Sequence, residues 1–216
     1  MESIQGKKPF HLTSTEFSRR IAGYDGLWLD LGTGDGRFVH QMARENPDSF
    51  FLGLDACREN LRESSRNCPD NALYLIASAQ DLPAELNGLL TQVSINFPWG
   101  SLLDGLLGGE PGLLGGLARV TQPGASLTLR LNGGALSEAG WEPEAGIRQV
   151  TDTLWQAGFL VQEPVRMSVS ALRAFPSTWA RRLAVGRDPR SWVVSARIPQ
   201  QVTPMPEIRL TEPAFV

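Results

Sequence analysis

The chain has 216 residues, of which 42% are hydrophobic and 20% charged, and its formal net charge is −3. This length suits one well-buried α/β domain with elaborations and is short for two domains. The sequence has no apolar run of about 18 residues that could cross a membrane, no N-terminal signal core and no CxxC spacing for its two cysteines. We therefore expect a cytoplasmic protein with no membrane partner and no metal. The acidic net charge argues against indiscriminate nucleic-acid binding.

Alternating apolar and polar segments predict strands and helices in regular succession. The expected strands are residues 27–31, 50–55, 72–77, 92–97, 126–132, 159–169 and 191–198. The expected helices are residues 36–45, 58–66 and 142–157, with a glycine-interrupted helix within 102–122. This order predicts an α/β fold whose seven-stranded sheet is mostly parallel, with an antiparallel edge strand.

Three regions follow from this pattern. Residues 1–26 are interpreted as an N-terminal extension with a hairpin-like pattern, and residues 27–198 as the α/β domain, with an arginine-rich insert at 170–190. Residues 199–216 contain several prolines and are expected to form an irregular tail.

A glycine-rich turn after the first core strand organises the chain. Residues 27–37 read LWLDLGTGDGR, so apolar residues around Asp30 lead into three alternating glycines and a helical pattern. Such a turn lets backbone approach a ligand closely. Asp30 and Asp35 would repel a pyrophosphate at the helix N-terminus, whereas a ligand with an ammonium and a sulfonium has no such conflict. The motif therefore favours S-adenosylmethionine over NAD.

A further carboxylate follows the second strand. Asp55 ends the apolar run at 50–55, where an acidic residue in such folds accepts hydrogen bonds from ribose hydroxyls. The alternative is that Asp55 caps the helix expected from Arg58. Spacing and position at the strand end favour the cofactor role.

An aromatic loop follows the fourth strand, where ligands bind in parallel sheets. Residues 96–101 read NFPWGS. The indole of Trp99 beside a methyl donor suggests a planar acceptor held by stacking; the alternative is a tryptophan that covers the edge of the core.

Positive charge gathers late in the chain. Between Leu160 and Gln200 seven arginines oppose two acidic residues, so this segment carries +5 (7 − 2). The helix at 58–66 places Arg58, Arg62 and Arg66 on one face, a stripe that also fits a solvated surface.

Five segments together resemble the 16S rRNA (adenine-1408-N1) methyltransferases, the kanamycin–apramycin (aminoglycoside) resistance enzymes that modify the ribosomal decoding site. They are DLGTGDGR at 30–37, LGLDA at 52–56, ASAQDLP at 77–83, NFPWGSLL at 96–103 and the late Trp192. The resemblance covers most of residues 27–198. It implies the Rossmann-like fold of class I S-adenosylmethionine-dependent methyltransferases and methylation of a flipped adenine in the 30S subunit, with S-adenosyl-L-homocysteine as the other product.

The resemblance and the charge distribution together give a set of expected site residues in a monomer. Trp99 and Trp192 would sandwich the flipped adenine. Cofactor contacts are expected from Asp30, Gly32, Thr33, Gly34, Asp55, Ala56, Ala79, Gln80, Asn96 and Ser101. Contacts to rRNA are expected from Lys7, Lys8, Arg62, Arg66, Arg181, Arg182, Arg187, Arg190 and Arg197.

The expected chemistry needs no general base, because adenine N1 carries an in-plane lone pair. Positioning then supplies most of the catalysis, and aromatic stacking returns roughly 1–3 kcal/mol per base against the few kcal/mol that base flipping costs.

Three alternatives remain. A tRNA guanine-N7 methyltransferase usually has an acidic or lysine-containing continuation after Pro-Trp, which residues 98–102 lack. A non-catalytic RNA-binding module on a decayed methyltransferase fold is disfavoured by the intact glycines and aspartates. A small-molecule methyltransferase is disfavoured by the basic late segment and the lack of a substrate-capping domain.

Overall fold

The computed structural model describes residues 1–186 and 188–199. Arg187 and residues 200–216, which make up nearly all of the expected tail, lie outside the described residues.

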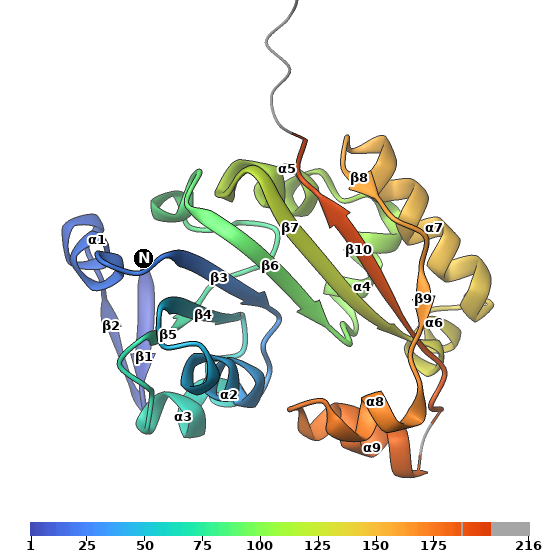
Figure 1. Ribbon diagram of the computed structural model, residues 1–216, viewed down its shortest axis with the longest axis horizontal. Helices are drawn as coiled ribbons and strands as arrows, with labels where there is room; N and C mark the ends of the chain where they lie inside the picture. Colours follow the sequence, from blue (N-terminus) through green and yellow to red (C-terminus); the bar gives the residue numbers. More distant parts are fainter. Residues whose placement is uncertain (187, 200–216) are drawn as a thin grey trace, which may run out of the picture.

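The strands of the described residues form one sheet with helices on both faces (Figure 1). The strands are β1 (Glu2–Gln5), β2 (Lys8–His11), β3 (Gly26–Leu31), β4 (Ser49–Asp55), β5 (Ala72–Ile76), β6 (Leu90–Asn96), β7 (Thr121–Asn132), β8 (Leu160–Val161), β9 (Val165–Arg166) and β10 (Ser191–Arg197). Their order is β2-β1-β5-β4-β3-β6-β7-β10-β8, with β9 also paired to β10.

The predicted mostly parallel sheet is confirmed within this larger one, but its antiparallel strand β10 lies between β7 and β8 rather than at the edge. Strands β5, β4, β3, β6 and β7 are parallel neighbours, and β10 is antiparallel to β7 and to the edge strands β8 and β9. The sheet has ten strands rather than seven because the hairpin β1–β2 adds two beside β5 and the sixth predicted strand is split in two. Pro164 lies between the halves, and proline cannot donate a ladder hydrogen bond.

The helices are α1 (Ser14–Ile21), α2 (Arg37–Glu45), α3 (Arg58–Arg66), α4 (Ser101–Gly108), α5 (Pro111–Val120), α6 (Gly133–Glu138), α7 (Pro143–Gln156), α8 (Val169–Ala174) and α9 (Thr178–Gly186), with a 3-10 turn at Ala84–Leu86. The predicted helices at 36–45, 58–66 and 142–157 correspond to α2, α3 and α7. The interrupted helix is two helices, because Gly109 adopts φ 71° after α4 and the Glu110 side chain caps α5. The arginine-rich insert contains α8 and α9.

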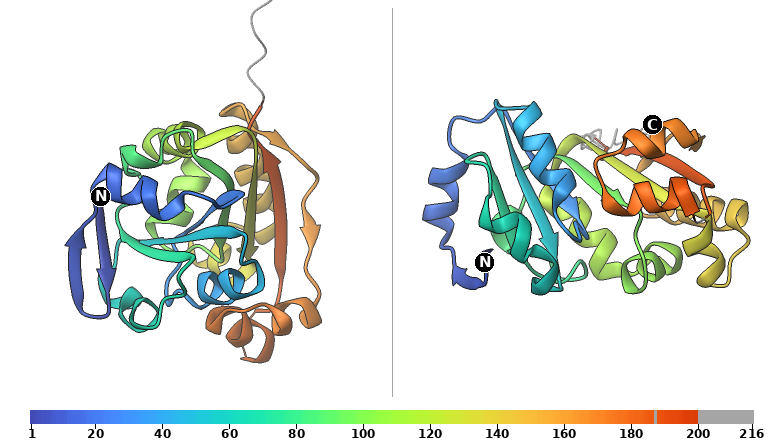
Figure 2. Two further views of the ribbon diagram at one scale, coloured as in Figure 1. Left: turned by 60° about the vertical axis from the view of Figure 1, so that its left-hand side comes forward. Right: turned by 90° about the horizontal axis from the view of Figure 1, so that it is seen from below.

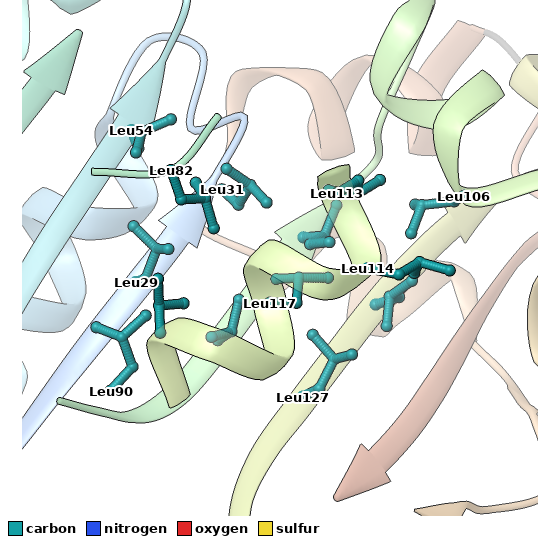
Figure 3. Close-up of a cluster of buried hydrophobic side chains, with 14 of the residues drawn as sticks. Leu29, Leu31, Leu54, Leu82, Leu90, Leu106, Leu113, Leu114, Leu117 and Leu127 are labelled. Atoms are coloured by element: carbon teal, nitrogen blue, oxygen red, sulfur yellow. The ribbon is translucent and has the colours of Figure 1, made fainter. Parts of the chain in front are cut away.

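A leucine-rich core fills the space between the sheet and the helices α4, α5 and α7. Figure 3 shows leucines of α5 directed toward leucines of β3 and β7, among them Leu29, Leu117 and Leu127. A smaller core under α2 and α3 contains Val39 and Tyr74. The right panel of Figure 2 shows α2, α8 and α9 on one side of the sheet and the green and yellow helices on the other.

The side of the sheet that faces α2 and α8 is polar along β6 and β7. Val93 and Ile95 are buried toward the leucine core, whereas Ser94 and Asn96 alternate with them and are half-buried on the opposite face. Arg130 occupies the same polar face on β7, opposite Asn96 in the β6–β7 register. This alternation puts hydrogen-bonding side chains beside the end of β3.

Candidate active site

The turn between β3 and α2 has left-handed backbone at each of its three glycines. The φ angle is 72° at Gly32, 56° at Gly34 and 70° at Gly36, a region that residues with a Cβ rarely adopt. A Cβ on Gly36 would lie 2.5 Å from the ring of Tyr74, whereas a Cβ on Gly34 would have no atom within 4 Å. Gly36 therefore permits close packing against β5, and Gly34 presents its backbone to open space that a ligand can enter.

Asp30 lies on β3 with 4% of its surface exposed. Its Oδ1 accepts hydrogen bonds from Ser94 Oγ at 2.8 Å and from Asn96 Nδ2 at 2.7 Å. Burial raises the pKa of Asp30 to about 6, although nearby hydroxyls, the Asn96 amide and the Arg130 guanidinium lower it in part. In the described residues no ion pair reaches this carboxylate. A ligand that brings positive charge would therefore stabilise its ionised form.

Asp55 ends β4 and holds the glycine turn. Its Oδ2 accepts from the backbone N–H of Gly34 at 2.9 Å, and its Oδ1 accepts from that of Cys57 at 2.8 Å. The N-cap residue of α3 is Cys57, so Asp55 does not occupy the capping position that was the alternative. Each carboxylate oxygen retains a second acceptor site for a ribose hydroxyl.

The remaining expected cofactor residues follow the ends of neighbouring strands. Ala56 is exposed after β4, Ala79 and Gln80 are half-buried after β5, and Ser101 is the exposed first residue of α4. Strands β3 to β6 are parallel, so their carboxyl ends share one edge of the sheet (Figure 1). The buried Asp30 carboxylate, the open Gly34 backbone and the Asp55 carboxylate fit the methionine and ribose parts of S-adenosylmethionine.

The aromatic loop after β6 contacts α9. Trp99 is 40% exposed, and its ring lies 5.5 Å from that of Trp179, centroid to centroid, at an interplanar angle of 80°. Phe97, two residues before Trp99, has φ 54°, and no other non-glycine in the described residues has a positive φ. Left-handed backbone at a bulky residue is strained, and such strain gathers at functional sites.

The structure corrects the assignment of Trp192 to the adenine sandwich. Trp192 lies on β10 with 7% exposed, in the core beneath α7, and the Arg166 guanidinium covers its ring at 5.4 Å. The tryptophan that contacts Trp99 is Trp179, which the sequence prediction missed. The alternation in β10 could have revealed this, since Trp192, Val194 and Ala196 share its buried face, whereas the other face carries Val193, Ser195 and Arg197 beside the buried Ser191.

The basic residues of the N-terminal hairpin and α3 lie together. Lys7 and Lys8 are exposed beside the hairpin turn, and the Gly6 N–H donates to Ser65 Oγ of α3 at 3.0 Å. Arg66 is exposed at the end of α3. Arg62 is half-buried and pairs with Glu59 at 2.7 Å. A groove of about 530 Å³ between α2, α3 and α9 is lined by Arg37, Arg44 and Arg181, among others.

The structure separates the other expected rRNA contacts. Arg181 and Arg182 are exposed on α9. Arg190 makes a 2.6 Å ion pair with Asp188, so its charge is largely compensated. Arg197 ends β10 beside Ser126 and Leu160, at the opposite end of the sheet from the site, and we correct its assignment to the docking surface. Arg187 lies outside the described residues.

The strand order and the strand-end site define a class I S-adenosylmethionine-dependent methyltransferase. A family model described as "NpmA: 16S rRNA (adenine(1408)-N(1))-methyltransferase" matches residues 2–198. The chain therefore belongs to the NpmA family of 16S rRNA (adenine(1408)-N(1))-methyltransferases, as the sequence resemblance predicted.

Three similar proteins illustrate this membership. A 16S rRNA (adenine(1408)-N(1))-methyltransferase of Streptoalloteichus hindustanus is 33% identical over 87% of this chain and 94% of its own. The crystal structure of the 16S rRNA methyltransferase KamB has a TM-score of 0.83 at 30% identity, and the match covers 92% of this chain and all of KamB. A variant of the Catenulisporales acidiphilia enzyme, solved with the cosubstrate SAM, has a TM-score of 0.83 at 26% identity over 94% of this chain and 99% of its own.

The tRNA alternative is much weaker. A tRNA (guanine-N(7)-)-methyltransferase of Geobacillus kaustophilus matches 38% of this chain and 41% of its own length.

Over residues 1–186 and 188–199, the structure contains no helix long and apolar enough to span a membrane. The same residues bring together no group of three His, Cys, Asp or Glu side chains suited to a metal.

Proposed function

We propose that this enzyme methylates N1 of adenine 1408 in 16S rRNA within the 30S subunit, and that this modification confers aminoglycoside resistance. The observation that carries the proposal is the contact between the exposed Trp99 and the half-buried Trp179, beside the expected cofactor site at the end of β6. S-adenosylmethionine, when bound, supplies a methyl group that the N1 lone pair accepts as the carbon–sulfur bond breaks. The product is cationic, and its positive charge is removed by later loss of an N6 proton.

The protein's part in this reaction is to hold two partners in line. Asp30 and the backbone at Gly32 to Gly34 would bind the methionine end, Asp55 the ribose, and the loop at Ala79 and Gln80 the cofactor adenine. The two indoles touch at 80° in the present arrangement, so at least one of them must rotate to admit a base between parallel rings. The exposure of Trp99 leaves room for that rotation.

Docking is proposed to use shape and phosphate contacts, because duplex RNA offers little base readout. Lys7, Lys8 and Arg66 would contribute on one side of the groove between α2, α3 and α9, and Arg181 and Arg182 on the other. We also propose that the enzyme acts as a monomer in the cytoplasm. Size-exclusion chromatography with light scattering should then give a mass near 23.6 kDa.

The decisive experiment is primer extension across 16S rRNA from cells that express the protein. Methylation of N1 blocks base pairing, so reverse transcriptase should stop at adenine 1408, and cells that express Trp99→Ala should show a weaker stop. Read-through at adenine 1408 together with 7-methylguanine in tRNA would replace this proposal by the tRNA alternative. An absence of any methyl transfer would favour a non-catalytic RNA-binding role.

A further inference from the structure

One arginine of the polar sheet face contacts both halves of the site. Arg130 of β7 is half-buried, and its Nη1 donates to Asn96 Oδ1 at 2.8 Å. The other end of that amide, Asn96 Nδ2, donates to Asp30 Oδ1 at 2.7 Å. Because an amide accepts at one end and donates at the other, the hydrogen bond from Arg130 fixes which end of Asn96 faces the carboxylate.

The same guanidinium also holds the segment that carries Trp179. It lies over the ring of Phe175 at 4.7 Å from the centroid, in cation–π geometry. Phe175 directly follows α8, and its ring stacks on Phe38 of α2 at 5.2 Å and meets the edge of Phe97 at 5.5 Å. Trp179 is four residues further along the chain, so the position of Phe175 sets where α9 begins.

Besides Phe175, the segment α8 is held by Leu172, which is buried in a small cluster with Phe97, Ala180 and Leu183. A cavity of about 510 Å³ lies between α2, α8 and the sheet, and its walls include Trp28, Met42, Thr128 and Ala171. Phe38 and Phe175 both line this cavity and stack on one another. The contacts that Phe175 makes with Arg130, Phe38 and Phe97 join the end of α8 to the sheet and to α2, beside the cluster around Leu172.

We propose that Arg130 is a positioning residue that couples the two halves of the site. It contacts Asp30 through Asn96, and it fixes the position of Trp179 through Phe175. The proposal rests on the proposed function in one respect, namely that Trp179 holds the acceptor base. Coupling between two sites is reciprocal, so a ligand that orders Asp30 and Asn96 also steadies Arg130 over Phe175. Cofactor binding thereby prepares the acceptor half of the site before the rRNA arrives.

The alternative is that Arg130 only compensates the buried charge of Asp30. In that case the loss of Arg130 would weaken cofactor binding, but the cofactor would have no effect on hydrogen exchange in α8 and α9. Hydrogen exchange of residues 169–186, measured with and without S-adenosylhomocysteine in the full chain, separates the two possibilities and requires no rRNA.

Four variants make the test. Arg130→Met removes the donor and the charge, and Arg130→Lys keeps the charge without the planar fork. Phe175→Leu removes only the aromatic ring beneath the Arg130 guanidinium. Arg119→Met is the matched control, because the guanidinium of Arg119 also donates to an asparagine side chain, that of Asn87, and to the Leu82 carbonyl, but not to Asn96. Its cofactor affinity is measured as well, because Leu82 lies two residues after Gln80.

In the wild type and in Arg119→Met, the cofactor should slow exchange in residues 169–186 by about fivefold or more, the lower range of typical coupling. Arg130→Met should weaken cofactor binding by about tenfold, as expected for one charge-assisted hydrogen bond, and should lose this protection even at saturating cofactor. Phe175→Leu should bind the cofactor normally, but it should also lose the cofactor-dependent protection of residues 169–186. On 30S subunits both variants should lower kcat by about a hundredfold with little change in KM for the subunit.

The outcome that overturns the proposal is cofactor-dependent protection of residues 169–186 that persists in Arg130→Met or in Phe175→Leu. If Arg130→Met does not fold, Arg130→Lys decides, because it should bind cofactor nearly normally yet show reduced protection. Because exchange is measured without rRNA, a different target nucleotide would refute the proposed function and leave this inference intact.

Discussion

The two halves of the site are built in different ways. The cofactor half consists of strand ends, left-handed glycines and two carboxylates. Backbone N–H groups hold Asp55, and the side chains of Ser94 and Asn96 hold Asp30, which is 4% exposed. The acceptor half consists of a loop and two short helices that meet through aromatic rings, and Trp99 is 40% exposed. A small cofactor can be enclosed by a preformed cradle, whereas a folded RNA must reach its site from outside. Changes in the first half should therefore alter binding and stability, and changes in the second should alter rate.

The largest effect is expected from a tryptophan that belongs to neither half. Trp192→Ala should lower the free energy of unfolding by about 3–5 kcal/mol, as large-to-small core substitutions do, because its indole is packed beneath α7. Thermal or denaturant unfolding measures the loss. Below its melting temperature the variant should still methylate 30S subunits. A folded but inactive Trp192→Ala would show instead that Trp192 contacts the acceptor base.

The next effect concerns the acceptor half itself. Trp99→Ala and Trp179→Ala should each cost roughly 1–3 kcal/mol of stacking, which is about a 5- to 150-fold loss in kcat/KM. The cofactor affinity should be unchanged in both variants, as should the melting temperature of Trp99→Ala, and the phenylalanine variants should keep part of the activity. Trp155→Ala is the control, because Trp155 is 70% exposed on α7. Unfolding in parallel with loss of activity would show that these indoles are structural.

The contrast between Trp179 and Trp192 also shows how far the sequence could be interpreted. The cofactor half is local: one strand and one turn carry Asp30 and the glycines, so a short motif predicts their proximity. The acceptor half joins β6 to a helix about eighty residues later, and no local pattern specifies that contact. The burial of Trp192 was available from strand alternation, and α1 from the capping box of Thr13 and Glu16. The contacts of Phe175 could not be predicted in this way, because its three partners come from three separate elements.

A smaller effect should distinguish the cofactor half by its response to pH. Burial raises the pKa of Asp30 from 3.8 to about 6, so the native state binds this proton more tightly than the unfolded state. Ionisation of Asp30 therefore opposes folding, and its contribution to stability falls as the pH rises from about 4 to about 6. Asp30→Asn should raise the free energy of unfolding of the cofactor-free protein at pH 7.5 by roughly 1–3 kcal/mol, with little gain near pH 4, and should weaken S-adenosylmethionine binding. Calorimetry and denaturant melts at both pH values measure this, with the exposed Asp35→Asn as the control; an Asp30→Asn protein less stable than wild type at pH 7.5 would contradict it.

The smallest effect tests whether the acceptor half extends into a docking surface around the groove between α2, α3 and α9. Arg66→Glu should weaken 30S binding, because it replaces an exposed charge near rRNA phosphates, and should lower the slope of log K against log salt concentration by about one. Cofactor affinity should not change, since Arg66 lies at the far end of α3 from Asp55. Arg197→Glu makes the same charge reversal at the opposite end of the sheet, so its binding and salt slope should match those of the wild type. Equal weakening by both reversals would mean that net charge alone governs association, and the groove would then have no special part in docking.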